Sequence, residues 1–382
     1  MKHEQNSECC RLCSAALTEV PIISMEPFPK AAQFYPREDE FAQDTGIVLD
    51  VFQCPSCGLV QLKIDPVDYY KEVITAAVLS PHAKLTRLTE MNAFVDRFGL
   101  RGKKALEIGS ARGDMLEVMA EAGLDAMGLE YGPKSIEYAK GKGRNIHLGY
   151  INDFNLKAKV DVFFSYNYLE HQPDAKAFIQ SVHRVTTPDA IGYVTVPNLE
   201  YLLASRCLYE FVADHLVYFT QRTLSLAFEM NGFDVLSCQA INNDNDIEII
   251  VQKRRQLNLS SYVAEVDDLS VRLNELVVQY TATGKKIAVW GAGHRTLALL
   301  AISRINKIEF IVDSADFKQG KYSPVMFNKI VSPKDLEASD VDAIIIMVPG
   351  LYPEEVLKAV RKFNRKLDVY ILKGNDIVVV DT

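Results

Sequence analysis

The 382-residue sequence lacks any apolar run long enough to cross a membrane, and its first ten residues, MKHEQNSECC, contain no apolar signal core. We therefore expect a cytoplasmic protein with no membrane partner. It also lacks an excess of basic residues, and its net charge of −8 argues against nonspecific binding to nucleic acid. The length allows two or three domains, and a hydrophobic content of 48% is ordinary for a globular chain.

Cysteine is sparse, but four of the seven cysteines stand in two pairs with C-x-x-C spacing. Each such turn holds two thiolates on one side of a knuckle, and two knuckles make a tetrahedral zinc site. Four protein ligands leave no open position for catalysis, so we expect a structural Zn²⁺ in a small zinc-binding domain of residues 1–72. The alternative is a set of unrelated buried thiols. The predicted ligands are Cys10, Cys13, Cys54 and Cys57.

The segment Ala105–Leu116, ALEIGSARGDML, lacks the second glycine of the G-x-G-x-x-G pattern found in dinucleotide-binding proteins, because Ala111 stands in its place. Its spacing is E-x-G-x-x-x-G, with Glu107, Gly109 and Gly113 between a predicted buried strand and a helix. Such a turn lets the backbone approach a ligand, and the helix N-terminus presents free N–H groups to it. A generic α/β turn without a ligand is the alternative.

Apolar stretches alternate with helical patterns through the middle of the chain, which predicts an α/β fold. Glu130 ends the second stretch, at a position where a carboxylate commonly accepts hydrogen bonds from ribose hydroxyls. A helical pattern over residues 69–98 precedes the first strand, and further helices are expected at 114–122 and 133–140. The expected strands are 104–109, 125–130, 146–148, 160–165 and 191–196, followed by a closing pair at 233–240 and 246–252.

Taken together, the glycine turn, the acid after the second strand and the LEH segment at residues 169–171 resemble the class I S-adenosylmethionine-dependent methyltransferases. The resemblance covers roughly residues 75–255 and implies a Rossmann-like core, at residues 73–256, that binds S-adenosyl-L-methionine. Asp153 is then a candidate partner of the adenine amine, although an aspartate in such a turn also serves as a cap. The cofactor-binding residues implied are Glu107, Gly109, Ser110, Gly113, Glu130, Asp153, Phe154 and Tyr166.

Residues 257–382 form a third region, in which a long amphipathic helix at 261–280 leads into a second Rossmann-like α/β domain. A strand and a glycine turn are expected at 286–293, further strands at 307–313, 342–348 and 367–372, and helices at 295–303 and 354–363. Gly291, Gly293 and Thr296 give a G-x-G-x-x-T match to a dinucleotide-binding turn. The missing third glycine, and the lack of a second catalytic domain, favour a role in substrate binding or packing over nicotinamide binding.

A histidine beside an aspartate, Asp214-His215, lies between the fifth strand and the closing pair, in a segment rich in aromatic residues. An imidazole titrates near neutral pH, so His215 is the candidate general base, with Asp214 to orient it. A structural histidine is the alternative at this position. We rank His171 lower, because the LEH segment does not by itself imply proton transfer.

The order of the three regions resembles the nucleotide-sugar C-methyltransferases, which add a methyl branch to 4-keto deoxysugars. DHLVYFT at 214–220 is similar to that family's EHLSYFS-type stretch, and VDSADFKQGKYSP at 312–324 is similar to its C-terminal signature. The resemblance implies a nucleotide-sugar substrate and a methyl transfer to carbon through an enolate that His215 generates. The substrate-binding residues we predict are Asn167, Tyr168, Asn198, Tyr218, His294 and Arg295.

Two departures from the family pattern concern the substrate. The family's tyrosine two residues before the acid falls on Val212, and its HGGS-type segment falls on the acidic stretch NDND at 243–246, which would repel a diphosphate. An O-methyltransferase stays open, as do an NAD-dependent oxidoreductase and an inactive zinc-stabilised binding protein. The sugar, the nucleotide, the position methylated and the oligomeric state are not decided by the sequence, and a monomer is among the options.

Overall fold

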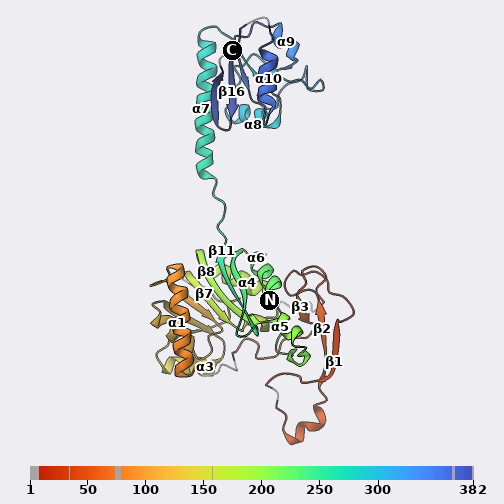
Figure 1. Ribbon diagram of the computed structural model, residues 1–382, viewed down its shortest axis with the longest axis vertical. Helices are drawn as coiled ribbons and strands as arrows, with labels where there is room; N and C mark the ends of the chain where they lie inside the picture. Colours follow the sequence, from red (N-terminus) through yellow and green to blue (C-terminus); the bar gives the residue numbers. More distant parts are fainter. Residues whose placement is uncertain (1–7, 34, 74–78, 157, 364–365, 381–382) are drawn as a thin grey trace. The chain divides into compact units, whose positions relative to one another are not determined.

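The computed structural model describes residues 8–33, 35–73, 79–156, 158–363 and 366–380. The chain divides into two compact units, Met1–Arg255 and Gln256–Thr382 (Figure 1). The first and second expected regions therefore fall within one unit, and the boundary at residue 72 stays a prediction. In the part of the chain that is described, no helix combines the length and apolar character needed to cross a membrane.

A seven-stranded sheet forms the centre of the first unit. Five of its strands are parallel, and an antiparallel hairpin closes one edge, as the sequence pattern predicts. This arrangement confirms the class I methyltransferase-type α/β fold. The strand order is β10 (Phe233–Ile241), β11 (Asp246–Lys253), β8 (Thr186–Pro197), β7 (Val160–Tyr166), β4 (Lys104–Ile108), β5 (Asp125–Glu130) and β6 (Ile146–Leu148).

Helices cover both faces of this sheet because its central strands are apolar on both sides. On β4, Leu106 and Ile108 pack in the cluster that includes α4 (Ala175–Val185) and α6 (Gln221–Glu229). Ala105 faces the opposite cluster, formed with α1 (Pro81–Phe98) and α2 (Asp114–Glu121). Because side chains alternate along a strand, Glu107 lies on the same face as Ala105, at the carboxyl end of β4. A third helix, α3 (Pro133–Gly141), packs beside β6.

The N-terminal segment builds a second, four-stranded sheet in the same unit. Its order is β1 (Ile23–Phe28), β2 (Ile47–Gln53), β3 (Val60–Leu62) and β9 (Val217–Tyr218). Because β9 lies two residues beyond His215, the pairing of β3 with β9 holds the predicted catalytic segment against the N-terminal strands. Short helices complete this unit, namely η1 (Glu38–Gln43), η2 (Leu169–His171), α5 (Leu199–Ala204) and η3 (Leu208–Glu210).

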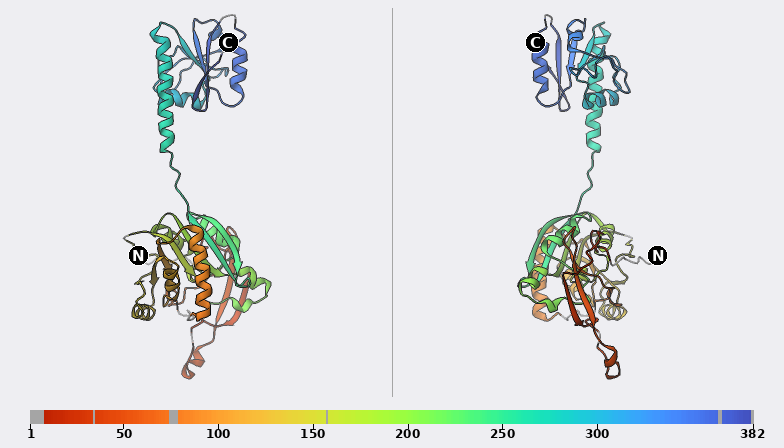
Figure 2. Two further views of the ribbon diagram at one scale, coloured as in Figure 1. Left: turned by 60° about the vertical axis from the view of Figure 1, so that its left-hand side comes forward. Right: turned by 90° about the vertical axis from the view of Figure 1, so that its right-hand side faces the viewer.

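The second unit is a six-stranded sheet between two layers of helices (Figure 2). Leucines and valines of α7 (Ser260–Ala282) and α8 (His294–Ile302) pack on one face, while α9 (Pro333–Glu337) and α10 (Tyr352–Val360) pack on the other. Only the last strand is antiparallel to its neighbour. The order is β14 (Ile330–Val331), β13 (Ile311–Val312), β12 (Ile287–Trp290), β15 (Ala343–Ile346), β16 (Asp368–Lys373) and β17 (Asp376–Val380).

Several elements differ in extent from their sequence patterns: the strand expected over 191–196 extends over Thr186–Pro197, and the two elements that follow are shorter than expected. The helix expected over 69–98 begins only at Pro81, because Ser80 caps it by accepting a hydrogen bond from the Ala83 N–H at 3.2 Å. Part of the expected stretch, 74–78, lies outside the described residues. The strand expected over 307–313 pairs only at Ile311 and Val312. Local apolar pattern therefore overestimates both elements, since a capping residue and the neighbouring strand set the actual ends.

Candidate active site

The glycine turn after β4 requires glycine at its first position. Gly109 has φ +73°, and a Cβ there would lie 2.7 Å from Cγ of Tyr168, so the tyrosine ring lies directly against the turn. Gly113, with φ +76°, precedes the first turn of α2. Between the glycines, Ser110 is buried and its hydroxyl has no hydrogen-bond partner among the described residues. The turn therefore carries one buried hydroxyl without a partner among the described residues.

Glu130 binds the backbone around this turn. One carboxylate oxygen accepts from the N–H of Ala111 at 2.8 Å, and the other accepts from Gly132 at 2.8 Å and from Tyr131 at 3.0 Å. Burial raises the pKa of Glu130, against the opposing effect of these donors. Among the described residues, the oxygen that faces Ala111 accepts this one bond, so it keeps capacity for a ribose hydroxyl.

Glu107 is fully buried, and its Oε2 atom has no hydrogen-bond partner within the described ranges. Burial, reinforced by the nearby Glu130 carboxyl, raises the pKa of Glu107 well above its ordinary value. A buried carboxyl without a partner is unfavourable unless a ligand satisfies it. S-adenosylmethionine carries a sulfonium and an ammonium group, so a carboxyl in this position fits a cationic ligand of that kind.

The other predicted cofactor residues lie at the same edge of the sheet but differ in environment. Asp153 is exposed in the turn after β6, and Phe154 packs beside Gly149. Tyr166, at the end of β7, lines a pocket of about 490 Å³ together with Met115 and Tyr193 rather than the pocket that contains His215. These three assignments stay predictions.

A pocket of about 260 Å³ opens beside the glycine turn. Tyr168 forms one side of it and His215 another, so a ligand in this pocket would contact the residue that covers Gly109. Tyr69 and Gln33, from the N-terminal segment, line it as well. The pocket is therefore assembled from the seven-stranded sheet, the loop that precedes β9 and the strand-rich N-terminal region.

Asp214 is buried and holds the N-terminal segment rather than the histidine next to it. Its carboxylate accepts from the Tyr69 hydroxyl and from the Ala32 N–H, both at 2.6 Å. Burial, together with this bond to Asp214, raises the pKa of Tyr69 to about 12. Among the described residues the Asp214 carboxylate makes no hydrogen bond to His215, so its orienting role stays a prediction. The Asp214 backbone does contact a second histidine.

That contact is to His171, whose Nδ1 lies 2.8 Å from the carbonyl oxygen of Asp214. A carbonyl only accepts, so Nδ1 carries the hydrogen and Nε2 of a neutral ring is left with its lone pair. The rings of His171 and His215 meet edge to face, with 4.7 Å between centroids. One carboxylate oxygen of Glu170 and one ring nitrogen of each histidine lie within 4.8 Å of one another. His171 thus belongs to the same cluster as His215.

Burial controls the protonation of this cluster. It lowers the pKa of His215 to about 3, with a further contribution from His171, and it lowers the pKa of His171 as well. It raises the pKa of the fully buried Glu170 to about 8. At neutral pH both imidazoles are therefore uncharged and able to accept a proton, whereas the glutamic acid holds one.

Two of the predicted substrate residues have structural contacts. The Tyr218 hydroxyl accepts from the Val212 N–H at 2.7 Å and donates to its carbonyl at 3.1 Å, which closes the turn that carries His215. Asn198 caps α5 and donates to the Asp244 carbonyl at 2.8 Å. Neither side chain lines the pocket of His215, whereas Asn167 and Tyr168 do.

The acidic stretch at 243–246 is only partly exposed. Asp246 is buried, accepting from the side-chain amides of Asn242 at 2.6 Å and Asn167 at 3.3 Å. Asp244 is exposed at the hairpin tip. The repulsion expected from NDND therefore comes mainly from Asp244, because amide donors compensate the Asp246 carboxylate.

His294 and Arg295 belong to the second unit, at the start of α8, where Arg295 donates to the Gly374 carbonyl at 3.1 Å. In the nearby turn, a Cβ at Gly291 would lie 2.7 Å from Val348, so packing alone requires this glycine. Asp313 stands where a dinucleotide-binding fold has the acid that binds ribose. Its carboxylate accepts from the Ala292 N–H at 2.8 Å and from Lys318 at 2.9 Å. Nothing in these contacts favours a nicotinamide site.

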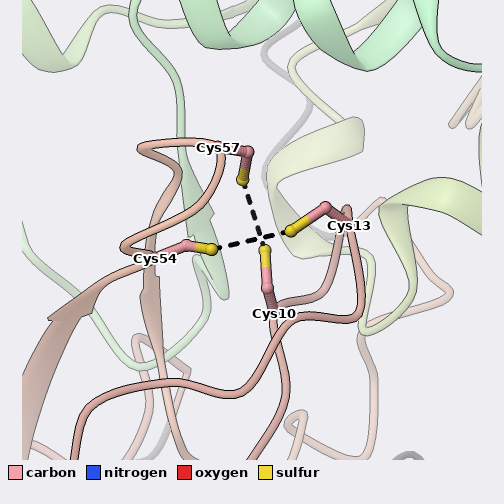
Figure 3. A group of neighbouring side chains, drawn as sticks. All are labelled: Cys10, Cys13, Cys54 and Cys57. Atoms are coloured by element: carbon pink, nitrogen blue, oxygen red, sulfur yellow. Dashed lines mark hydrogen bonds between the residues drawn. The ribbon is translucent and has the colours of Figure 1, made fainter.

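The four predicted zinc ligands converge in one cluster (Figure 3). The sulfur atoms of Cys10 and Cys57 lie 3.5 Å apart, and those of Cys13 and Cys54 lie 3.6 Å apart. Tetrahedral zinc with Zn–S bonds of about 2.3 Å separates its sulfur ligands by about 3.8 Å. The cluster therefore has the donor set and nearly the spacing that a tetrahedral zinc ion requires, with Cys9 outside it.

Sequence reasoning missed Tyr69 and undervalued the pair Glu170–His171. Tyr69 stands 145 positions from its partner Asp214, and no local pattern links them. The LEH segment did carry a signal, since a glutamate and a histidine are adjacent in it, but their burial beside His215 depends on β9 and the N-terminal strands. The pairing of distant segments is what creates this pocket.

Comparison with known proteins agrees with this architecture. A methyltransferase domain family matches residues 83–238, and the family of C-methyltransferase C-terminal domains matches residues 242–372. C-methyltransferase NovU of Streptomyces niveus is 24% identical over 385 aligned residues, which cover 90% of each protein. Ubiquinone biosynthesis O-methyltransferase of Haemophilus ducreyi is 32% identical over 112 residues, or 26% of this chain and 48% of that protein.

Among solved structures, an S-adenosylmethionine-dependent methyltransferase from Clostridium acetobutylicum ATCC 824 aligns with 44% of this chain and 92% of its own, at 10% identity and a TM-score of 0.39. The two family matches lie side by side along the chain, in the order of its two α/β sheets. The chain is an S-adenosylmethionine-dependent methyltransferase whose C-terminal part matches the family of C-methyltransferase C-terminal domains, and it is similar to a C-methyltransferase over 90% of its length.

Proposed function

We propose that the enzyme transfers a methyl group to a carbon atom of a nucleotide-linked 4-keto deoxysugar, and that His215 removes the proton from that carbon. The position of His215 carries the proposal, since it lines the same pocket as Tyr168, whose ring lies on Gly109 of the cofactor turn. The base and the tyrosine that covers the cofactor turn therefore line one pocket. Similarity to a protein named as a C-methyltransferase over 90% of the chain supports carbon as the acceptor.

The turn fits S-adenosylmethionine in its donors and acceptors. Glu107 offers a buried carboxyl without a partner, Ser110 offers an unpaired hydroxyl, and the Glu130 oxygen at Ala111 has room for a further bond. When bound, S-adenosylmethionine supplies an electrophilic methyl group. The protein's own task is to position the acceptor carbon and to move its proton.

His215 suits proton removal from a carbon next to a ketone because it stays uncharged. Within the described part of the chain its imidazole makes no hydrogen bond, so a ring nitrogen is available to the substrate. His171 packs edge-on against the ring and is itself fixed by the Asp214 carbonyl. Tyr69 and Ala32 in turn hold the carboxylate of Asp214. The N-terminal segment therefore positions His215 indirectly, through the Asp214 carbonyl and the ring of His171.

The four-cysteine cluster is proposed to hold a structural zinc ion. Its role would be to fix the N-terminal strands, which carry Ala32 and Tyr69 to the pocket. A buried arginine next to the first ligand supports this role. Arg11 donates to the carbonyls of Leu62, Ile64 and Pro173, which ties the cysteine knuckle to β3 and to the methyltransferase core.

The test is incubation in heavy water with S-adenosylmethionine and a panel of 4-keto nucleotide sugars, followed by mass spectrometry and NMR. The expected product is heavier by one methylene, with the new methyl on carbon, and recovered substrate carries deuterium beside the ketone. His215→Ala should abolish both signals, whereas His82→Ala, an exposed histidine of α1, should leave them unchanged. A methyl found on oxygen, or no transfer to any keto sugar, would contradict the proposal.

A further inference from the structure

The carboxyl group of Glu170 has no task in the scheme above, yet it lines the pocket of His215. Its side chain is 2% exposed, and its Oε2 atom has no hydrogen-bond partner among the described residues. The other oxygen lies 4.0 Å from Nε2 of His171, which is beyond a direct hydrogen bond. An unpartnered buried polar atom in a residue that lines a pocket calls for a partner, which a ligand can supply.

The surroundings keep this carboxyl protonated. Burial raises its pKa, and the Asp246 carboxylate acts in the same direction, whereas the Glu170 backbone opposes the shift. The other titratable groups that line this pocket are His171 and His215, both uncharged at neutral pH, the carboxyls of Glu72 and Asp214, and the phenols of Tyr69, Tyr70 and Tyr168. None of these supplies a positive charge that would favour the carboxylate.

We propose that Glu170 is the catalytic acid of the pocket, donating its proton to the ketone oxygen of the substrate while His215 accepts the proton from the adjacent carbon. This inference rests on the proposed function. The C–H bond breaks, its electron pair forms the carbon–carbon double bond, and the carbonyl π pair takes the proton of Glu170. The products of this step are a neutral enol, a Glu170 carboxylate and a protonated His215, so charge and atoms balance.

Geometry and charge both favour this division of roles. A Glu170 oxygen and a His215 nitrogen lie within 4.8 Å, a span that a ketone oxygen and its neighbouring carbon can bridge. With Glu170 as the acid the product is a neutral enol, so the pocket does not have to bury the negative charge of an enolate. When two neighbouring groups have pKa values pushed in opposite directions, the raised carboxyl acts as acid and the lowered imidazole as base.

The test follows exchange of the carbon-bound proton in heavy water without any methyl donor, so that it does not depend on methyl transfer. The probes are thymidine diphosphate 4-keto-6-deoxyglucose and guanosine diphosphate 4-keto-6-deoxymannose. Glu170→Leu removes the donor and should slow exchange about 10²–10⁴-fold. Glu170→Gln keeps a neutral hydrogen-bond donor of nearly the same shape and should retain at least about ten times the rate of the leucine variant.

Two results would overturn the inference, namely exchange at the wild-type rate in Glu170→Leu, or a glutamine variant no faster than the leucine variant. The second would mean that Glu170 acts as a base or through its charge. Failure of the wild-type enzyme to exchange either probe would instead contradict the proposed function. In that case infrared spectroscopy still decides, because a protonated Glu170 gives a carboxylic acid carbonyl band that Glu170→Gln removes and that Glu210→Gln, an exposed control, leaves in place. Absence of that band at neutral pH would refute the assignment.

Discussion

Replacing Gly109 with alanine should damage the cofactor turn more than backbone strain alone explains. Alanine at φ +73° costs roughly 1–2 kcal/mol, because its Cβ crowds the following carbonyl. In addition, that Cβ would lie 2.7 Å from Cγ and 2.8 Å from Cδ2 of Tyr168, well inside ordinary carbon contact of about 3.5–4.0 Å. The tyrosine is buried and its hydroxyl donates to the Lys71 carbonyl at 2.8 Å, so the ring cannot withdraw freely.

Such overpacking adds about 1–3 kcal/mol, and the total loss for Gly109→Ala should reach about 2–5 kcal/mol. Gly102→Ala is the matched control, because Gly102 has φ +74° and nothing lies within 4 Å of its added Cβ. We expect the control to lose only about 1–2 kcal/mol. The measurements are denaturant unfolding of the first unit and calorimetric binding of S-adenosylhomocysteine, which Gly109→Ala should weaken at least tenfold and Gly102→Ala should not.

Combining Gly109→Ala with Tyr168→Ala tests the cause directly. Without the ring the added methyl has room, so part of the lost stability should be recovered. The coupling free energy between the two substitutions should be about 0.5–3 kcal/mol. Equal stability and equal ligand affinity of Gly109→Ala and Gly102→Ala would refute the reasoning. Simple additivity of the effects of Gly109→Ala and Tyr168→Ala would refute it as well.

Two further predictions concern the cysteine cluster and the buried carboxyl. Cys57→Ser should release the zinc, measured by elemental analysis, and should lower the midpoint of thermal unfolding. Cys9→Ser, the control outside the cluster, should change neither quantity. Zinc retained in Cys57→Ser would count against the four-thiolate site. Because the pKa of Glu170 rises from 4.5 to about 8 on folding, the folded protein holds a proton that the unfolded chain loses in that interval, and the free energy of unfolding should fall as pH rises through it. Glu170→Gln should reduce this slope in urea titrations, whereas the contribution of Glu107, whose pKa burial also raises, should remain; an unchanged slope would show that Glu170 does not contribute.

The methyltransferase fold could be predicted because its signals are local. Glycines at 109 and 113, an acid at 130 and apolar stretches of strand length all lie within one segment, and the structure contains the strands they indicate. The two C-x-x-C pairs are equally local, and their convergence needs only that two knuckles meet. Element ends were less predictable, as at α1, because capping and strand pairing set them.

The roles around His215 were harder to predict because they depend on burial and on distant partners. Asp214 stands next to His215 in sequence, yet its carboxylate binds Tyr69 and Ala32, and its carbonyl binds His171. Tyr218 is predicted to bind substrate, yet its hydroxyl closes a turn on Val212. A side chain's neighbours in sequence say little about its direction, which packing decides.

The sequence by itself determined the α/β class, the glycine turn with its two acids and the four thiols, because each of these depends on residue type and short-range spacing. Only the tertiary structure decided which titratable groups share a pocket and how each is protonated. Glu170, His171 and His215 come together because β9 pairs with β3 and draws the loop of residue 215 against the helical turn at residue 170. Burial then moves the pKa of the acid up and that of the base down, and no sequence pattern encodes the dielectric environment that causes both shifts.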